Sequence, residues 1–483
     1  MRTFPLPGNS RTGRLLGLAL GLWVVLAAVA RAEGAGGSPG GPMASMIVLG
    51  AIMLATYIAI AFELLHKALA AMCGAVLAVI AAMAFGLFGA GGYETVHEII
   101  GHDLGVLGVI LGTSILVEIA GHSGLFHFIS VNIVKRTQGE PKRLFLYMIV
   151  LTVLFCTLLT IAPGTLIMVT LALAVTKELK LDPKPYIMGI ALAANSGALV
   201  TFASGICTMM VGAKAGLHYM DFFRVTTPIA LLSAVVVWAV VRRLYRDELR
   251  DRGDPVERAK RVQSFDPWAL VHDRRIFWRS AIILLATVAG FATAQAMGVG
   301  LDLIAMAGGA AALLLSGFDT ETAIRKVKWP LIVFFVGLFT LIGCVQATGL
   351  LAKLAGGIEA LSGGNPLATT MILGVFVLVL SGIVDNIPVA ATLIPIVVAM
   401  GQNGMDVTPL WWTLVVCANL GGNSTPVGSV AAVIAVHALE KERNIRIGWG
   451  EYLKAGGLTL AIQGVLALTY LWAFFEFDLF PEG

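Results

Sequence analysis

The chain has 483 residues, of which 58% are hydrophobic and 13% are charged. Soluble domains carry roughly 45–50% apolar and about 25% charged residues, so this composition excludes an ordinary soluble protein. The net charge of +4 comes from scattered basic residues, and no basic stripe interleaved with aromatic residues indicates a nucleic-acid partner. The composition therefore predicts an all-α polytopic protein whose surroundings are the lipid bilayer.

The N-terminus has the pattern of a secretory signal peptide. Basic residues up to Arg14 precede an apolar run at 15–29, which ends in the small-x-small sequence Ala-Arg-Ala at 30–32. We expect a signal peptide over 1–32 and a flexible linker over 33–45, in a multi-pass protein of a bacterial-type inner (plasma) membrane. The alternative is an uncleaved first helix, and in both cases the following segment starts outside the cytoplasm.

Long apolar stretches follow, separated by basic loops. The expected membrane segments of the first half are 46–65, 68–88, 106–120, a hairpin block at 144–175, a broken segment at 186–213, and 226–241. Those of the second half are 280–297, 301–316, 331–350, a hairpin block at 367–400, a broken segment at 410–437, and 455–474. The stretches 91–104 and 121–143 are expected to be loops.

Lysine and arginine orient these segments, because short cytoplasmic loops are enriched in both. Basic residues flank both ends of the block 144–175, which predicts a re-entrant hairpin with its tip near Thr160 to Pro163. Its counterpart has its tip at Asp385 to Pro388 and is expected to enter from the opposite side. Five crossings in each half is an odd number, so the two halves are expected to be inverted.

The chain repeats itself at an offset of about 225 residues. The sequence ANSGALVT at 194–201 returns as ANLGGNST at 418–425. Further pairs 225 residues apart are Gly112 with Gly337, Gly124 with Gly349, Pro141 with Pro366, and Pro163 with Pro388. The repeat predicts a first transporter repeat at 46–241, a charged cytoplasmic linker at 242–279 and a second repeat at 280–483. In transporters, broken hydrophobic segments at matching positions mark the substrate site.

Metal-binding and disulfide patterns are weak. The five cysteines have no paired spacing, so neither a disulfide framework nor a metal site is expected. The stretch 91–104 contains Glu94, His97, Glu98, His102 and Asp103, which offers a metal cluster as an alternative to a solvated loop. The loop is favoured, because the histidines are five residues apart and no third ligand stands at helical spacing.

Two second-half strings carry a family resemblance. The sequence SGIVDNIPVAATLIP at 381–395, followed by LWWTLVVCANLGGNSTPVGSVAAV at 410–433, resembles the ion transporter superfamily branch of arsenite permeases, NhaD-type sodium/proton antiporters and the melanosomal P protein. Citrate and dicarboxylate carriers are more distant members. The resemblance implies two opposed hairpins and two unwound helices that meet near the midplane. It also implies a homodimer as the partner assembly, because such relatives are commonly dimeric.

The polar residues at the hairpin tips and helix breaks are the candidate site. The predicted substrate- or ion-binding residues are Thr160, Thr165, Asn195, Gly197, Thr201, Thr208, Asp385, Asn386, Asn419, Gly421, Gly422, Asn423, Ser424 and Thr425. Glycines permit breaks and close approach, and the amides and hydroxyls supply neutral ligands. The alternative role of such small and polar residues is helix packing. Their recurrence in both halves at one offset favours a site.

Two carboxylates are candidates for ion or proton coupling. Asp385 lies within an apolar block, where a charge costs roughly 2.5–3.5 kcal/mol and usually marks an ion or proton pathway. The alternative role for Asp385 is to cap the second arm of its hairpin. Glu118 is the second candidate, although its place near a cytoplasmic helix end also fits a solvated residue.

The first half departs from the family pattern. The offset places Thr160 and Ile161 opposite Asp385 and Asn386, where related first halves carry an Asp-Asn pair. After the first break, Ile206-Cys207-Thr208 replaces the relatives' Pro-Pro-Asn. The Ser-Asn-Thr hairpin signature of sodium-coupled dicarboxylate carriers is absent from both tips. These departures disfavour a sodium-dicarboxylate carrier.

The predicted function is secondary active transport of a small inorganic ion or small anion, coupled to a proton or sodium gradient by alternating access. A sodium/proton antiporter and an anion channel are the alternatives. No enzyme is expected, since no Walker loop or nucleophile arrangement is present. Apart from sodium or a proton as coupling ion, no cofactor or metal is expected.

Overall fold

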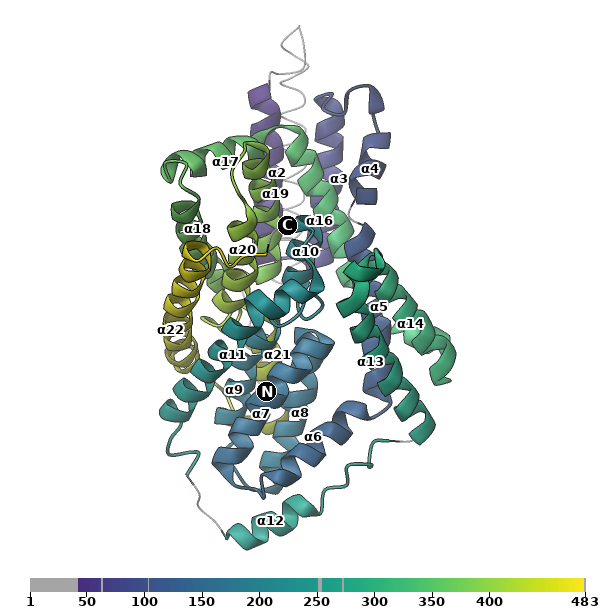
Figure 1. Cartoon of the computed structure of the whole chain (residues 1–483), viewed down its shortest axis with the longest axis vertical. Helices are drawn as coiled ribbons and strands as arrows, with labels where there is room; N and C mark the ends of the chain where they lie inside the picture. The colour runs from purple at the N-terminus through teal and green to yellow at the C-terminus, as the bar shows by residue number, and fades with distance from the viewer. Residues whose placement is uncertain (1–41, 62–63, 103, 251–253, 272, 482–483) are drawn as a thin grey trace. The chain divides into compact units, whose positions relative to one another are not determined.

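The computed structural model describes residues 42–61, 64–102, 104–250, 254–271 and 273–481. The predicted signal peptide at 1–32 and nearly all of the linker at 33–45 lie outside these residues. Every regular element in the described part is a helix (Figure 1). Ten of these helices are long and apolar enough to cross a membrane. The prediction of an all-α polytopic membrane protein is confirmed.

The described helices follow the predicted order of the apolar segments. Those of the first half are α2 (Pro42–Ala61), α3 (Lys67–Ala84), η1 (Gly89–Gly91), α4 (Glu94–His102), α5 (Leu104–His122), α6 (Leu125–Arg136), α7 (Pro141–Leu159), α8 (Ile161–Glu178), α9 (Lys184–Gly197), α10 (Ile206–Ala215) and α11 (Tyr219–Leu244). Those that follow are α12 (Pro255–Gln263), α13 (Arg274–Met297), α14 (Leu301–Ser316), α15 (Thr320–Arg325), α16 (Trp329–Ala347), α17 (Leu350–Leu361), α18 (Pro366–Ile383), α19 (Asn386–Gln402), α20 (Thr408–Gly421), α21 (Val430–Arg443) and α22 (Trp449–Glu476).

Two segments expected to be loops contain helices. The stretch 121–143 contains α6, whose buried residues Leu125, Phe126, Ser130 and Val134 recur at helical spacing. The basic residues at the end of this segment favoured a loop, although its apolar residues recur at helical spacing. The stretch 91–104 contains the nine-residue helix α4. Both expectations of a loop were wrong.

The helices form two compact units, and neither coincides with a sequence half. One unit comprises residues up to 107 together with 328–361 and 395–404, and the other comprises 108–327, 362–394 and 405–483. In the smaller unit, α3 packs against α2 and α16. In the larger unit, α7 packs against α8 and α9, and α18 packs against α20. Each unit thus combines helices from both repeats.

Glycines permit close helix contacts between the two repeats. A Cβ added at Gly112 of α5 would collide with the backbone of Ala305 on α14, within the larger unit. A Cβ added at Gly337 of α16 would lie 2.7 Å from the carbonyl carbon of Ala71 on α3, within the smaller unit. Gly112 and Gly337 are related by the 225-residue offset, so the same close approach occurs once in each unit.

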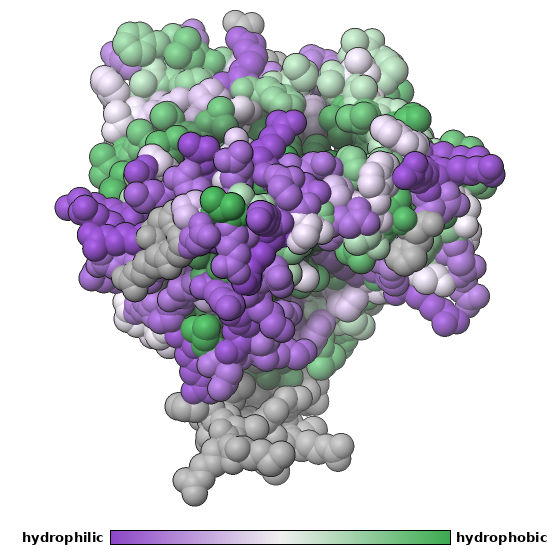
Figure 2. Space-filling model, turned by 90° about the horizontal axis from the view of Figure 1, so that it is seen from below, coloured by the Kyte–Doolittle hydropathy of each residue, from purple (hydrophilic) through white to green (hydrophobic). Residues whose placement is uncertain are grey.

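The predicted cytoplasmic ends of several helices meet at α12. Gln263 Nε2 donates to the Lys135 carbonyl at the end of α6, at 3.2 Å, and Arg261 Nη1 donates to the Glu178 carbonyl at the end of α8, at 3.1 Å. Tyr186 on α9 donates to the carbonyl of Pro141, where α7 begins, at 3.1 Å. Both open ends of the α7–α8 hairpin therefore lie on one side of the larger unit (Figure 1). Figure 2 views the molecule from the α12 side, and hydrophilic residues dominate that face.

Candidate functional site

The first hairpin turns at a single residue. Helix α7 ends at Leu159, α8 begins at Ile161, and Thr160 between them has φ 73° and ψ 164°. This conformation is essentially restricted to glycine, and a side chain there stores strain. The two arms approach closely behind the tip, since a Cβ at Gly164 would lie 2.9 Å from the Cys156 amide nitrogen. The predicted tip near Thr160 is thus found at one strained position.

The second hairpin turns at Val384 and Asp385, between α18 and α19. Asp385 immediately precedes the first residue of α19, which is a capping position. Only 8% of Asp385 and 4% of Asn386 are exposed. Asn386 Nδ2 donates to Asn419 Oδ1 on the broken segment, at 3.3 Å. The hairpin therefore holds a buried carboxylate and an amide against α20.

Both broken segments interrupt where the sequence repeats. Helix α9 ends at Gly197 and α10 begins at Ile206, while α20 ends at Gly421 and α21 begins at Val430. A Cβ at Gly197 would lie 2.6 Å from the Val153 carbonyl oxygen, and one at Gly421 would lie 2.6 Å from that of Leu378. Each break is thus pressed against the first arm of the hairpin in its own repeat. The predicted interruption at 195–201 is shifted, because Asn195 and Ser196 are still helical.

Hydroxyl groups satisfy the backbone carbonyls that the first break releases, as burial of such groups requires. Thr157 donates to the Gly197 carbonyl at 3.1 Å, and Thr226 donates to that of Leu199 at 2.5 Å. Ser204 donates to the carbonyl of Ala198 at 2.7 Å.

In the second repeat, hydroxyl groups donate to a carbonyl of the broken segment and to one of the hairpin arm beside it. Ser381 donates to the Ala418 carbonyl at 2.5 Å, and Thr425 donates to that of Gly382 at 2.8 Å. Both breaks are therefore ordered, polar and internally supported.

The broken segments of the two repeats interlock. Helix α21 packs against α8 and α9, whereas α10 packs against α20. Ile161 at the first hairpin tip packs on the buried cluster of Cys156, Ala194 and Ala431. At the second tip, Asp385 lies within electrostatic range of Cys207 on α10. The first hairpin tip thus packs against the second helix of the opposite repeat's broken segment.

A buried chain of amides connects the repeats. Asn195 Nδ2 donates to Asn423 Oδ1 at 2.7 Å, and Asn423 Nδ2 donates to Gln463 Oε1 on α22 at 2.9 Å. Gln463 Nε2 donates to the hydroxyl and carbonyl oxygens of Ser233 on α11, at 2.6 and 3.2 Å. The Ser233 hydroxyl shares a 2.7 Å hydrogen bond with that of Ser196. None of these five side chains is exposed.

The amide chain includes residues that the sequence prediction missed. Gln463 and Ser233 were not among the candidate residues, although a glutamine inside an apolar 28-residue helix is itself unusual. Ser196 and Thr157 were also missed. The available signal was an isolated polar residue inside an apolar helix. Of the four missed residues, Ser196 alone lies in the repeated string at 194–201.

The remaining predicted residues support the backbone. Thr208 Oγ1 accepts from the Gly205 amide at 3.0 Å, at the start of α10. The Thr165 hydroxyl lies 3.9 Å from Cys156 Sγ. A Cβ at Gly422 would lie 2.9 Å from the Gly428 carbonyl oxygen. Ser424 Oγ occupies the space beside Gly382, and Thr201 Oγ1 lies 3.4 Å from the Thr157 carbonyl oxygen.

Glu118 lies in a different setting. Its carboxylate pairs with Lys326 at 3.1 Å and with His122 at 3.2 Å, and about a third of its side chain (32%) is exposed. Lys326 also lies 5.9 Å from the centroid of the Phe318 ring. The charge of Glu118 is thus compensated within an exposed cluster, whereas Asp385 is buried at a hairpin tip.

Two hollows lie in the larger unit. A cavity of about 20 Å³ borders the first hairpin tip and is lined by Thr157, Thr160, Thr201 and Tyr219, with other residues of α5 and α13. A void of that size holds about one water molecule.

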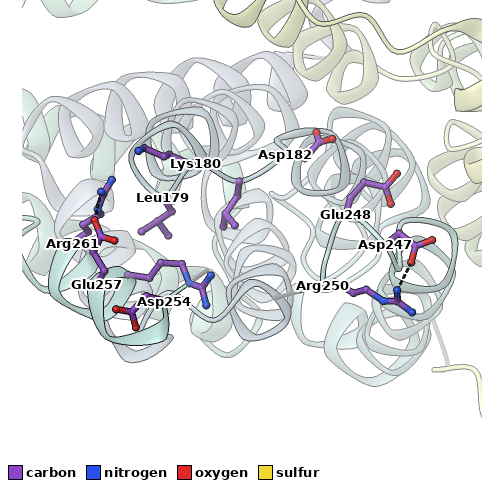
Figure 3. A pocket seen from close by; sticks show the side chains of 11 residues that line it. Leu179, Lys180, Asp182, Asp247, Glu248, Arg250, Asp254, Glu257 and Arg261 are labelled. Atoms are coloured by element: carbon purple, nitrogen blue, oxygen red, sulfur yellow. Dashed lines mark hydrogen bonds and ion pairs between the residues drawn. The ribbon is translucent and has the colours of Figure 1, made fainter. Parts of the chain in front are cut away.

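The second hollow, of about 470 Å³, lies against α12 and is lined by charged side chains (Figure 3). Arg250 pairs with Asp247 at 3.3 Å, and Arg261 pairs with Glu257. Its charges therefore partly compensate one another around the inter-repeat linker.

Comparisons with known proteins identify the family. The model of the citrate transporter family matches residues 57–417, which is most of the chain. The chain belongs to the citrate transporter family. A 46 kDa membrane protein of Mycobacterium leprae is 30% identical over 87% of this chain and 97% of its own length. An uncharacterized transporter of Mycobacterium tuberculosis is 28% identical over 88% of this chain and 98% of its own.

This family member also has more distant relatives. The arsenical pump membrane protein of Escherichia coli is 22% identical over 85% of this chain and 95% of its own length. In fold, the chain is similar to the crystal structure of the Alcanivorax borkumensis YdaH transporter, with a TM-score of 0.62 and 16% identity, over 86% of this chain and all (100%) of that one. The chain is thus a multi-pass membrane transporter of the citrate transporter and arsenical pump family, and the predicted resemblance is confirmed.

Proposed function

We propose that this chain is a secondary active carrier of a small inorganic ion or small anion, coupled to a proton or sodium gradient by alternating access. The observation that carries the proposal is the convergence of two hairpin tips and two broken helices around Asp385 and the buried amide chain. Broken helices near the bilayer midplane bind substrates and coupling ions in many transporters, because released amides and carbonyls are available there.

The buried charged side chains restrict the charge of the transported species. Among the described residues, the buried charged side chains are Asp385 and Arg258, and Arg258 lies on α12 at the charged hollow. Among the described residues, the hairpin tips and breaks therefore contain a buried carboxylate, and the buried arginine lies elsewhere, on α12. A multiply charged free anion in such a place lacks compensation by a cation, and burial of unpaired charge is costly. A monovalent ion, or an anion that binds together with a cation, fits better.

Asp385 is the proposed coupling group. A buried carboxylate binds a cation or a proton and loses its charge when it does so, which links the charge of the site to the gradient. The counterpart of Asp385 in the first half is Thr160, so we propose one titrating group and not two. This asymmetry makes the second hairpin the coupling half of the site.

The proposal includes an arrangement in the membrane. We propose that α7–α8 and α18–α19 are re-entrant hairpins that enter from opposite sides of a bacterial inner membrane, within inverted repeats. Both open ends of α7–α8 lie beside the hydrophilic α12, as expected of a hairpin that enters and leaves on one side of the membrane. We propose a homodimer as the assembly, which the family resemblance implies.

A flux screen tests the proposal. Purified protein in proteoliposomes is offered radiolabelled sodium, citrate and related acids, arsenite and chloride, with an imposed proton or sodium gradient. We expect uphill accumulation of one species that collapses when the gradient is removed. Downhill movement alone, unaffected by either gradient, would indicate an anion channel and contradict a carrier.

The matched variants are Asp385→Asn and Glu118→Gln. Asp385→Asn keeps side-chain size and the ability to cap α19, because asparagine caps about as well as aspartate. We expect it to fold and to lose uphill accumulation, while Glu118→Gln retains both. An unchanged accumulation ratio and pH profile in Asp385→Asn would remove Asp385 as the coupling group. Exchange of sodium for protons without an anion would favour the antiporter.

A further inference from the structure

The amide chain between the repeats has a fixed direction. Gln463 Nε2 lies 3.2 Å from the carbonyl oxygen of Ser233, and a carbonyl oxygen only accepts hydrogen bonds. Gln463 Oε1 must then face Asn423, which donates to it, and Asn423 Oδ1 must accept from Asn195. Reversing any one amide places two oxygens or two nitrogens together. The backbone of α11 therefore determines the orientation of the Asn195 side chain.

The chain ends in an oxygen that has no partner. Asn195 is fully buried, and its Oδ1 makes no hydrogen bond in the structure. An unsatisfied buried acceptor destabilises the fold, so a native protein that keeps one has a specific reason for it. Aligned amides polarise one another, which strengthens the acceptor at the end of the chain. Asn195 also lies in the last turn of α9, where the helix dipole adds negative potential.

The second repeat shows what the first one lacks. The repeat counterpart of Asn195 is Asn419, whose Oδ1 accepts from Asn386 on the second hairpin. The first-hairpin counterpart of Asn386 is Ile161, which has no side-chain donor and packs on the cluster containing Ala194. The first half thus retains the acceptor but not the internal donor that satisfies it.

We infer that Asn195 Oδ1 binds an electropositive group at the first hairpin, either a hydrogen-bond donor of the transported species or a monovalent coupling cation. Gln463 and Ser233 act as positioning residues, because they present the oxygen of Asn195 and not its amide. The inference rests on the proposed function, in which the broken helices form the transport site. A bare anionic oxygen is rejected at this position, whereas a hydroxyl, a protonated acid or a sodium ion is accepted.

Transport kinetics of Asn195→Leu and Asn195→Asp test the contact. We expect Asn195→Leu to raise a half-saturating concentration at least about tenfold, while Asn195→Asp, which when protonated donates to Asn423 and keeps an acceptor oxygen, stays closer to wild type. If the ligand is the cation, the sodium constant rises at saturating cargo. If the ligand is a donor on the cargo, the cargo constant rises at saturating sodium. Both constants within twofold of wild type in Asn195→Leu would overturn the inference.

Gln463 variants test the positioning role. Gln463→Leu frees Asn423 and Asn195 to rotate, so it is expected to raise the same constant as Asn195→Leu with little change in maximal rate. Gln463→Glu, when protonated, still accepts from Asn423 and donates to Ser233, and is expected to recover part of the affinity. Equal loss of maximal rate in both Gln463 variants, with unchanged constants, would indicate a structural role alone and contradict positioning.

Filling the acceptor from within the chain gives an independent test. Ile161→Asn supplies the donor that the second repeat has, and Ile161→Leu is the control of matched size without a donor. We expect Ile161→Asn to lose ligand affinity and Ile161→Leu to keep it. Equal affinity of the two variants would overturn the inference.

An equilibrium measurement separates this inference from the proposed function. If wild-type protein moves no species in the flux screen, the proposed function fails. The thermal midpoint of the purified full chain is then compared in sodium chloride, in choline chloride and with each acid of the screen. Stabilisation of wild type that Asn195→Leu loses supports the binding site even without transport, and no stabilisation of wild type by any probe overturns it.

Discussion

Thr160 at the tip of the first hairpin has a strained backbone, and its substitution tests the structure directly. Its φ of 73° and ψ of 164° lie in a region that side chains essentially avoid, and its side chain makes no capping hydrogen bond to α8. Replacement by glycine removes the Cβ that causes the strain. Since no cap is lost, we expect Thr160→Gly to stabilise the folded protein.

The magnitude follows from two opposing terms. Relief of the backbone strain contributes of order 1–3 kcal/mol. The greater freedom of glycine in the unfolded chain costs roughly 0.4–1 kcal/mol. The net expectation is therefore a stabilisation of about 0.5–2 kcal/mol. In a chain of this length, that corresponds to a rise in thermal midpoint of roughly 0.5–2 °C.

The assay is thermal unfolding of purified protein, followed by tryptophan fluorescence, with Thr160→Ala as the matched control. Alanine removes the hydroxyl and methyl groups but keeps the Cβ, so the strain remains. We expect the glycine variant to unfold about 0.5–2 °C above the alanine variant, since the strain and the opposing entropy cost of glycine both separate the two. A Thr160→Ala protein as stable as Thr160→Gly, or more so, would refute the assignment of strain to this tip.

Three further predictions concern packing, topology and pH. Gly421→Ala adds a Cβ 2.6 Å from a carbonyl oxygen of α18 and is expected to cost about 1–3 kcal/mol in thermal unfolding, whereas Gly457→Ala, with open space around it, is expected to cost nothing. Single cysteines at Val256 and Gly363 are expected to react with impermeant label from the cytoplasmic and the outer side respectively, and labelling from one side would contradict inverted repeats. Burial lowers the pKa of His127, so the unfolded chain binds its proton more readily and stability falls as pH drops below about 6.5. His127→Gln is expected to flatten the dependence of the thermal midpoint between pH 7 and 5, and an unchanged slope would exclude His127 as a contributor.

The repeated string and the apolar segments made much of the architecture predictable. Long apolar runs have one stable solution in a bilayer, which is the helix. The repeated glycines at Gly197 and Gly421 marked the ends of α9 and α20, since each permits a contact that a Cβ would block. Helix α6 escaped prediction because its basic end dominated the interpretation of the segment. The buried residues of this segment recur at helical spacing, but its basic residues favoured a cytoplasmic loop.

The sequence by itself determined the membrane environment, the helical class, the internal repeat, the two breaks and the tip residues Thr160 and Asp385, because composition, spacing and proline positions act locally. Only the tertiary structure decided which helices of one repeat pack against the other repeat, and which polar groups form hydrogen bonds. The bonds from Asn195 to Asn423 and from Asn423 to Gln463 join residues 228 and 40 positions apart, and no local pattern encodes such a distance. The orientation of Asn195 depends on one backbone carbonyl of α11, so its unsatisfied oxygen is visible only once α9, α11, α22 and the second break are packed together.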